Sequence, residues 1–325
     1  MRTLVTGATG FLGVNLCQHL TAAGVETRAL ARAPERAQAL SALGVEVVAG
    51  DVTDEASLAR ALADVDVVYH LAGKLFIPGV PAEEYHAFHE QGTRNMLRQA
   101  RAHGVRRFVH CSTTGVFGVT GAHPANEDAP YAPTNAYERT KLQGEAQTRA
   151  AIREGFPAVI IRPGLVYGPG DLHLLGFFHS IQRGVFRPIG RAPVWLHPVY
   201  IDDMSAAMLR AAEAPEAVGE AFNIAGTQPV TLRTLAQEIA KSLGVAEPRG
   251  WIPLPLAQAV ALAGDALPAS LRHRAPLTTS RLDFLTHSRM YDVGKAQRLL
   301  GFSAETPLTV GLAETARWYR SEGLL

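Results

Sequence analysis

Short runs of apolar, often β-branched residues alternate with segments of helical periodicity over the first half of the chain. The apolar runs predict strands at Leu4–Thr6, Glu26–Leu30, Val45–Ala49, Val65–Leu71, Arg107–Cys111 and Ala158–Arg162. The segments between them predict helices near residues 11–23, 34–42, 55–63, 82–103 and 134–154. Runs such as VDVVYHLAG (65–73) are apolar almost throughout, as expected of a strand buried on both faces. The pattern therefore predicts an α/β fold with a doubly wound parallel sheet.

The alternation stops after about residue 165, where glycines and prolines become frequent and strands become isolated. Helices are predicted near 173–184, 203–213 and 231–243, and an amphipathic helix near 308–321. We therefore expect a dinucleotide-binding domain over 1–170 and mainly a smaller C-terminal substrate-binding lobe over 171–325. Segments 197–203 and 221–226 are expected to return to the main domain.

Composition narrows the classes of function. The 325 residues are 47% hydrophobic with a net charge of +1, and no basic run is long enough to follow a nucleic-acid backbone. Cys17 and Cys111 fall in apolar segments, which favours two buried thiols over a disulfide. The apolar stretch 252–267 is interrupted by proline and glycine and is too short to span a bilayer. We expect a cytoplasmic protein with a small-molecule substrate, no nucleic-acid partner and no transmembrane segment.

The first predicted strand runs into the sequence TGATGFLG, whose glycines are Gly7, Gly10 and Gly13. Gly7 suits a tight turn, Gly10 lets backbone N–H groups approach a pyrophosphate, and Gly13 lets the following helix pack closely on the strand. A plain glycine-rich turn is the alternative. The position between the first strand and the first helix favours the dinucleotide site of a Rossmann fold.

The second predicted strand ends at Leu30-Ala31-Arg32, where a carboxylate would bind the ribose 2′-hydroxyl of NAD. Arg32 and Arg36 stand there instead, so we expect NADP(H) to be preferred, with NAD(H) possible. Arg32 could alternatively stack on the adenine. Asp51 could accept a hydrogen bond from the adenine amino group, or Asp51 or Asp54 could cap the next helix.

Tyr137 and Lys141 are four residues apart on a predicted helix, which places both side chains on one face. An ammonium near a phenol stabilises the phenolate and lowers the phenol pKa, which makes proton exchange with a substrate hydroxyl feasible. Such a pair is more often an ordinary surface pair. The fifth predicted strand, however, ends in HCSTT (110–114), at the sheet edge where ligands bind.

These motifs resemble the extended short-chain dehydrogenase/reductase family, also called the NAD-dependent epimerase/dehydratase family. The resemblance covers nearly the whole chain and rests on TGATGFLG, GDVTD (50–54), HLAG (70–73), GTRN (92–95), STTGVFG (112–118), Tyr137-x-x-x-Lys141, RPGLVYGPGD (162–171), VYIDD (199–203), FNIAG (222–226), KAQRLLGF (295–302) and WYRSEG (318–323).

The resemblance implies Tyr137 as the acid/base, Lys141 as its electrostatic partner and a contact of the nicotinamide ribose, and Thr113, beside Ser112, as the group that orients the substrate oxygen. It also implies a homodimer formed through the helices near 82–103 and 134–154. The expected cofactor-binding residues are Gly7, Thr9, Gly10, Phe11, Leu12, Gly13, Arg32, Asp51, Val52, Leu71, Ala72, Gly73, Tyr137, Lys141, Pro163 and Val166.

Several positions depart from the family pattern. Thr114-Gly115 replaces the acidic pair of the dehydratases, which argues against a 4,6-dehydratase. Leu165 and the stretch 195–197 stand where nucleotide-sugar epimerases tend to carry diphosphate-binding Asn and Arg. His89 replaces an Asn and is expected to be a structural substitute. Lys74 could reach the substrate but is more typical of a solvated loop.

Two further features bear on the substrate and on a possible metal site. The segment 252–290 is similar to the hydroxysteroid and sterol branch, and could be a hydrophobic flap or an amphipathic helix packed on the core. His86 and His89 lie three apart without a suitable third ligand, so no metal site is expected.

The prediction is therefore an NAD(P)-dependent oxidoreductase that transfers a hydride to or from a secondary alcohol or ketone carbon of a weakly charged, sterol-like substrate. One alternative is a nucleotide-sugar epimerase that uses tightly bound NAD. The other is a non-catalytic NADP(H)-sensing regulatory protein, which the retained Tyr137, Lys141 and Thr113 disfavour.

Overall fold

A seven-stranded parallel sheet is the centre of the structure, a computed structural model that describes residues 1–75, 77, 80–268, 275 and 277–325. All its pairings are parallel, and the order reverses between β1 and β4, which opens a crevice at the carboxyl edge of the sheet. The predicted doubly wound α/β fold is confirmed. In spatial order the strands are β3 (Glu46–Ala49), β2 (Glu26–Ala31), β1 (Arg2–Thr6), β4 (Val67–His70), β5 (Arg107–Cys111), β6 (Ala158–Pro163) and β10 (Ala221–Ile224).

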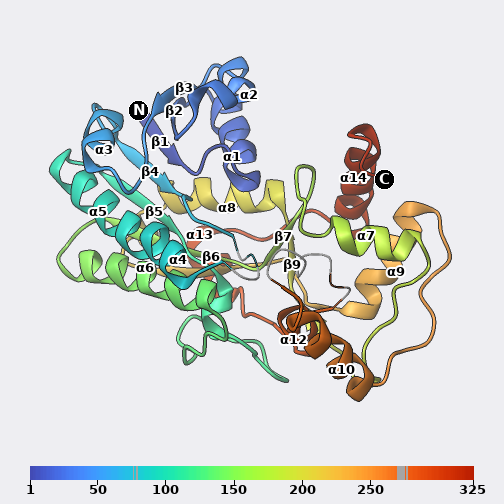
Figure 1. Ribbon diagram of the computed structural model, residues 1–325. Helices are drawn as coiled ribbons and strands as arrows, with labels where there is room; N and C mark the ends of the chain where they lie inside the picture. Colours follow the sequence, from blue (N-terminus) through green and yellow to red (C-terminus); the bar gives the residue numbers. More distant parts are fainter. Residues whose placement is uncertain (76, 78–79, 269–274, 276) are drawn as a thin grey trace.

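Helices cover both faces of this sheet (Figure 1). Successive side chains of a strand point to opposite faces, so Val5 and Val109 join one core and Leu4 and Phe108 join the other. The first core includes residues of α1 (Phe11–Ala22), α2 (Gln38–Ala42), α8 (Ile201–Glu213) and α13 (Gly294–Leu300). The second includes residues of α3 (Glu55–Ala61) and α5 (Gly92–Ala102), and α6 (Ala136–Arg153) packs beside α5.

Two segments of the C-terminal half lie at the main domain, and one of them is a strand of its sheet. Residues 221–224 add β10 beside β6. The segment 197–203 does not join this sheet, because β9 (Pro198–Tyr200) pairs with β7 (Leu165–Tyr167) in a separate two-stranded sheet. The chain reaches β7 through Gly164, where a Cβ would lie 2.6 Å from the carbonyl oxygen of His197. Only glycine fits this close approach, at the junction between β6 and the strand β7 that pairs with β9.

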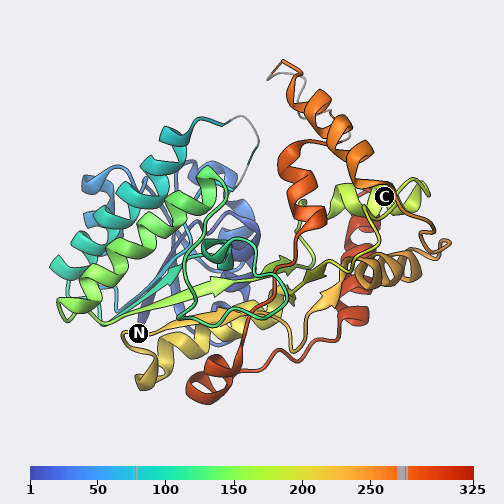
Figure 2. The same cartoon turned by 90° about the horizontal axis from the view of Figure 1, so that it is seen from below.

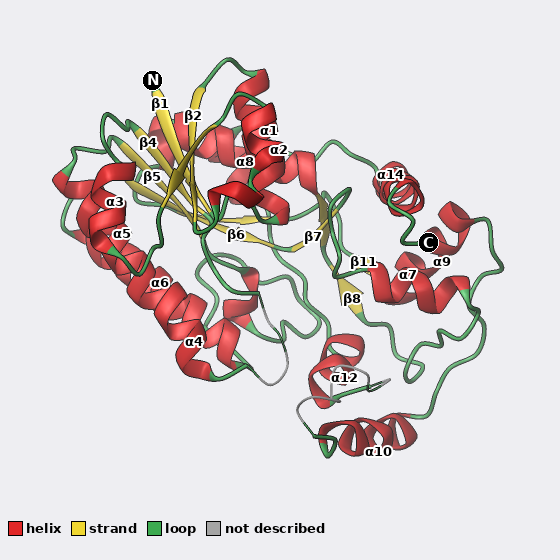
Figure 3. Cartoon of the chain, turned by 45° about the horizontal axis from the view of Figure 1, so that its top comes forward, coloured by secondary structure: helices red, strands yellow, loops and turns green. Residues whose placement is uncertain are grey.

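The remaining elements form a smaller lobe beside the sheet (Figure 2). Its core is built by α7 (Leu175–Gln182), α9 (Leu232–Leu243) and α14 (Leu308–Ser321), with the short strands β8 (Trp195–Leu196) and β11 (Val230–Thr231). Two further helices, α10 (Leu254–Asp265) and α12 (Thr279–Thr286), pack on each other at the end of this lobe far from the sheet (Figure 3). No described helix is long and apolar enough to cross a bilayer.

The single helix predicted over 82–103 is divided into three parts. These are α4 (Ala82–His86), a π-helical turn η2 (Ala87–Gln91) and α5. The predicted helix over 34–42 is likewise divided, into the 3-10 turn η1 (Pro34–Arg36) and α2. A π-turn widens the helix by one residue and is frequent at functional sites. Here it contains His89, which faces the cavity described below.

Candidate active site

A cavity of about 510 Å³ lies at the carboxyl edge of the sheet, over the point where the strand order reverses. Its walls come from the loop after β1, the ends of β2 to β6 and helix α6. All the residues expected to bind the cofactor, and Thr113, line this one cavity. Leu75, Phe88 and His173 also line the cavity, although no sequence motif predicted them there.

The glycine loop leaves space and hydrogen-bond donors for a pyrophosphate. Gly7 has a φ of +69°, and a Cβ there would lie 2.8 Å from the backbone nitrogen of Ala72. A Cβ on Gly13 would lie only 2.2 Å from the carbonyl oxygen of Gly7, so α1 can pack this closely only with glycine. Gly10 caps α1, whose first turn has neither a side-chain cap nor an acidic residue. The first N–H groups of α1 therefore remain available to an anion, and the loop fits a dinucleotide.

The adenosine end of the cavity is arranged partly as expected. Arg32 lines it, with its guanidinium carbon 5.4 Å from the ring centroid of Phe88. Arg36 is exposed in η1 and is not one of the lining residues. The carboxylate of Asp51 accepts hydrogen bonds from the backbone nitrogen and the hydroxyl of Thr53, at 2.9 and 2.8 Å. Asp54 caps α3 by accepting from Ala56 N, so the capping role belongs to Asp54.

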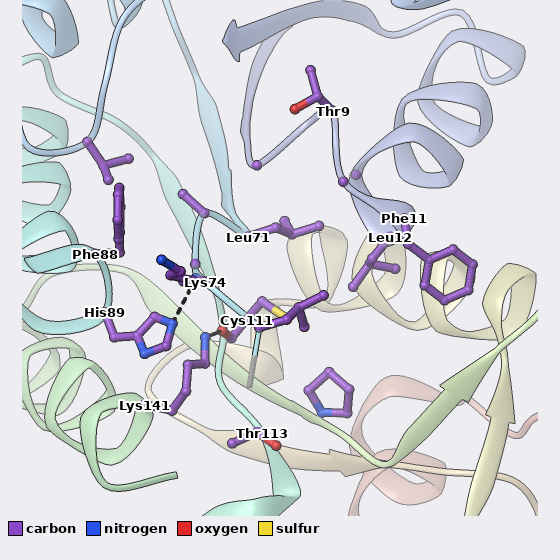
Figure 4. A pocket seen from close by; sticks show the side chains of 18 of the residues that line it. Thr9, Phe11, Leu12, Leu71, Lys74, Phe88, His89, Cys111, Thr113 and Lys141 are labelled. Atoms are coloured by element: carbon purple, nitrogen blue, oxygen red, sulfur yellow. Dashed lines mark hydrogen bonds between the residues drawn. The ribbon is translucent and has the colours of Figure 1, made fainter. Parts of the chain in front are cut away.

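Helix α6 brings Tyr137 and Lys141 to the opposite wall. The helix begins after Asn135, whose side chain accepts a hydrogen bond from Glu138 N. The Thr113 side chain lines the same wall beside the Tyr137 phenol. Thr113 belongs to the turn after β5, so a strand end and a helix supply the two hydroxyl groups. The Lys141 ammonium is buried and donates to the carbonyl oxygen of Cys111 (Figure 4).

Burial shifts the pKa values of both Tyr137 and Lys141. It raises the pKa of Tyr137 above the ordinary value, and the neighbouring Thr113 hydroxyl opposes this shift only in part. Burial also lowers the pKa of Lys141. The expectation of a lowered phenol pKa is not met, because desolvation raises it and the Lys141 ammonium is directed at a backbone carbonyl instead. The phenol is neutral at physiological pH and can donate a proton.

A buried ion pair beneath this wall was missed by the sequence analysis. Arg162 and Glu145 are both completely buried and are joined by hydrogen bonds of 2.6 and 3.1 Å. Ser112 donates to the same carboxylate at 2.7 Å, so its hydroxyl is engaged below the cavity. The available signal was a charged residue at the end of an otherwise apolar strand, IIRP (160–163).

The other candidate residues occupy varied places. Lys74 lines the cavity and also forms an ion pair with Glu84. Arg191 stacks on Trp251, 4.7 Å from its ring centroid. The described part of α10 contributes nothing to the cavity lining. It buries Ala257, Ala261 and Gly264 against its own lobe. In the described ranges no cluster of His, Cys, Asp and Glu could hold a metal ion.

Comparison with known proteins agrees with this geometry. Residues 3–225 match the model of the NAD dependent epimerase/dehydratase family. Sterol demethylase protein B of Methylococcus capsulatus is 31% identical over 340 residues, covering 100% of each chain. The 4-hydroxy-2-methyl-3-oxo-4-farnesyl-3,4-dihydroquinoline-1-oxide ketoreductase of Stigmatella aurantiaca is 31% identical over 96% of this chain and 95% of its own.

A solved structure shows the same fold. UDP-glucuronic acid 4-epimerase from Bacillus cereus, in complex with NAD, superposes with a TM-score of 0.77 over 99% of both chains, at 24% identity. At this identity the likeness concerns the fold alone. The family match spans more than half of the chain, and the relatives span almost all of it. The chain therefore belongs to the NAD-dependent epimerase/dehydratase family of extended short-chain dehydrogenases/reductases and is an NAD(P)-dependent oxidoreductase.

Proposed function

We propose that this protein is an NADP(H)-preferring reductase that interconverts a ketone and a secondary alcohol on a weakly charged, largely apolar substrate. One observation carries the proposal: Tyr137, Thr113 and Lys141 line the wall of one dinucleotide-sized cavity. A neutral phenol in that position is a proton donor for a carbonyl oxygen.

The nicotinamide, when bound, would supply the hydride to the carbonyl carbon or accept it back. Tyr137 gives its proton to the carbonyl oxygen as the C=O bond becomes C–O–H, and Thr113 hydrogen-bonds the same oxygen and orients it. The buried Lys141 places a positive charge near the phenolate that remains. In the oxidative direction Tyr137 takes the proton back, so atoms and charge balance in both directions. The loop Gly7–Gly13 would hold the pyrophosphate, and Lys141 the nicotinamide ribose.

The substrate class is inferred from what surrounds the cavity. Leu165 and the stretch 195–197 provide no cation for a diphosphate, and His197 is buried with its Nε2 2.8 Å from Gly226 O. Arg191 is engaged with Trp251 instead. The two relatives described above are named for a sterol and for a farnesylated quinoline ketone, both largely apolar. These points favour a sterol-like or similarly apolar ketone over a sugar nucleotide.

The preference for NADP(H) rests on Arg32. The residue lines the cavity at the end of β2, the position that contacts the adenosine ribose in this fold, and no carboxylate competes there. A guanidinium can bind a 2′-phosphate through two parallel hydrogen bonds, which NAD(H) cannot match.

The test is a reduction assay with NADPH and with NADH against a panel of apolar ketones, sterol ketones and sugar nucleotides. We expect stoichiometric NADPH oxidation with an apolar ketone, and loss of turnover in Tyr137→Phe with NADPH binding retained. Conversion of a sugar nucleotide without net change in added cofactor would instead identify an epimerase. Cofactor binding without turnover of any ketone, and an unaltered cellular role in Tyr137→Phe, would identify a sensor.

We also propose that the protein acts as a cytoplasmic homodimer. Its support is the family resemblance, which implies pairing of the helices near 82–103 and 134–154, together with a groove between α4, η2 and α6. Sedimentation equilibrium of the wild type and of Ala136→Arg, which fills this groove, tests the proposal. The wild type should be a dimer and the variant a monomer.

A further inference from the structure

His89 lies where three parts of the site meet. It belongs to the π-turn η2, is only 2% exposed and lines the cavity. Its ring meets the ring of Tyr137 edge-on, with 5.4 Å between the centroids. Figure 4 shows the imidazole between Lys74 of the loop after β4 and Lys141 of α6.

The hydrogen bonds of the ring define a single tautomer. Nε2 lies 3.0 Å from the backbone nitrogen of Lys74, which can only donate, so Nε2 accepts and carries no hydrogen. The hydrogen is therefore on Nδ1, which donates to the hydroxyl oxygen of Thr140 at 2.9 Å. The Thr140 hydroxyl donates in turn to the carbonyl oxygen of Ala136 at 2.9 Å. Each donor in this chain thus meets an acceptor.

The ring is neutral at physiological pH. Burial and the positive charge of Lys141 lower the pKa of His89 to about 3, against the opposing effect of the bond from Lys74 N. Charged and titratable groups that face the ring come from several elements: His70 from β4, Tyr85 from α4, and Tyr137 and Lys141 from α6. A neutral ring with both nitrogens engaged has no proton to exchange with a substrate.

The two hydrogen bonds connect segments far apart in sequence. On one side is the loop that contains Leu71, Ala72 and Gly73, which line the cavity. This loop is in close contact with the ring, since a Cβ on Gly73 would lie 3.1 Å from Nε2. On the other side is the first turn of α6, which contains Tyr137. The His89 carbonyl is also fixed, accepting from the Thr93 hydroxyl at 2.6 Å.

We propose that His89 is a positioning residue that clamps the cofactor-facing loop Leu71–Lys74 to the catalytic helix α6 and so sets the distance between the cofactor and Tyr137. This inference rests on the proposed function, because it takes the cavity to be the NADP(H) site. It assigns His89 no acid/base step.

Three substitutions separate the two bonds. His89→Gln places an amide oxygen about where Nε2 lies, and so can still accept from Lys74 N. His89→Asn reaches only the Nδ1 position, and so keeps the contact with Thr140 but loses the loop. His89→Ala loses both. His103→Ala, at the exposed end of α5, is the matched control.

The main measurement is the dissociation constant for NADPH from fluorescence titration, with thermal unfolding recorded for each variant. We expect His89→Asn and His89→Ala to bind about tenfold more weakly, because a backbone N–H loses its acceptor. His89→Gln should stay within about twofold of the wild type. Equal affinities in all folded variants, or His89→Gln no better than His89→Asn, would overturn the proposal.

A second pair of variants tests the bond between His89 and helix α6 by changing Thr140. Thr140→Val keeps the shape and removes the hydroxyl, whereas Thr140→Ser keeps it. Thr140→Val, like His89→Gln, should bind NADPH within about twofold of the wild type but reduce the ketone more slowly, and Thr140→Ser should recover the rate; equal rates in the two would contradict the clamp.

The pH profile of ketone reduction distinguishes positioning from proton transfer. The profile of His89→Gln should be parallel to that of the wild type at lower or equal rate, and loss of an ionisation near neutral pH would count against the proposal. Failure of the wild type to bind either dinucleotide would refute the proposed function itself, a result distinct from equal binding by wild type and variants.

Discussion

Arg162 and Glu145 form an ion pair in which neither side chain is exposed to solvent. The pair joins the end of β6 to the middle of α6, and the bond from Ser112 extends it to the end of β5. The remaining Arg162 nitrogen donates to the carbonyl oxygen of Glu127 at 3.1 Å. These bonds hold together the ends of β5 and β6 and helix α6, the segments that present Thr113, Pro163 and Tyr137 to the cavity.

Removing one partner of this buried pair should lower the free energy of unfolding far more than removing a charged side chain that is exposed. Arg162→Met leaves a buried carboxylate that has lost its main partner, so we expect the free energy of unfolding to fall by about 3–5 kcal/mol in urea denaturation. Arg149 pairs with the same carboxylate but is 34% exposed, and Arg149→Met should cost less than about 1 kcal/mol. Equal losses would mean that burial does not control the energy of this pair.

The pH dependence of catalysis should follow the raised pKa of Tyr137. Reduction needs the protonated phenol, which is fully populated below this pKa, so its rate should stay level through pH 6–9 as far as this group controls it and fall only above about pH 10. Oxidation needs the phenolate and should increase with pH over the same interval. Tyr137→Phe should lower both rates by about 10²–10⁴-fold. A reduction rate that falls between pH 7 and 8, and loses this fall in Tyr137→Phe, would contradict a raised pKa.

Arg32 should discriminate between the two dinucleotides. In Arg32→Met we expect the dissociation constant for NADPH to rise about tenfold or more, because a charge-assisted bond to phosphate is lost, and that for NADH to change by less than about twofold. Arg36→Met is the control, since Arg36 is exposed and not a lining residue, and should bind both as the wild type does. Equal weakening of NADPH and NADH would indicate that Arg32 only stacks on the adenine.

Alanine substitutions at Gly13 and Gly24 should lower the free energy of unfolding by clearly different amounts. In Gly13→Ala the added Cβ would meet backbone atoms at 2.2 and 2.6 Å, which cannot move without shifting α1, so we expect a loss of about 3 kcal/mol and of NADPH binding. At Gly24 nothing lies within 4 Å, and only the φ of +71° opposes a side chain. Gly24→Ala should cost about 1 kcal/mol and leave binding intact. Calorimetric unfolding with NADPH titration compares the two, and similar costs would exclude close packing as the reason for Gly13.

The sequence allowed the sheet and the cavity wall to be predicted because both depend on local pattern. Apolar runs interrupted by helical segments define a doubly wound sheet, and the ends of parallel strands meet at one edge. The residues chosen at those ends, such as Arg32 and Thr113, therefore line one cavity.

Features that depend on distant contacts were not predictable in this way. The π-turn at 87–91 adds one residue to a helical turn and barely alters the apolar periodicity of 82–103. The pairing of Glu145 with Arg162, and of β9 with β7, depends on segments brought together only by the fold. The expected direction of the Tyr137 pKa shift was wrong for a related reason, because desolvation depends on all the atoms packed around this residue.

The position of β10 has a consequence for biosynthesis. The strand completes the edge of the main sheet, with Gly219 N donating to Ala158 O at 2.8 Å, and α8 and α13 cover one face of that sheet. A nascent chain released only as far as residue 170 would therefore expose the edge of β6 and the apolar face that α8 and α13 bury. The nucleotide-binding half should mature only after residues 294–300 of α13 have left the ribosome, and the two halves should not be separable as independently expressed fragments.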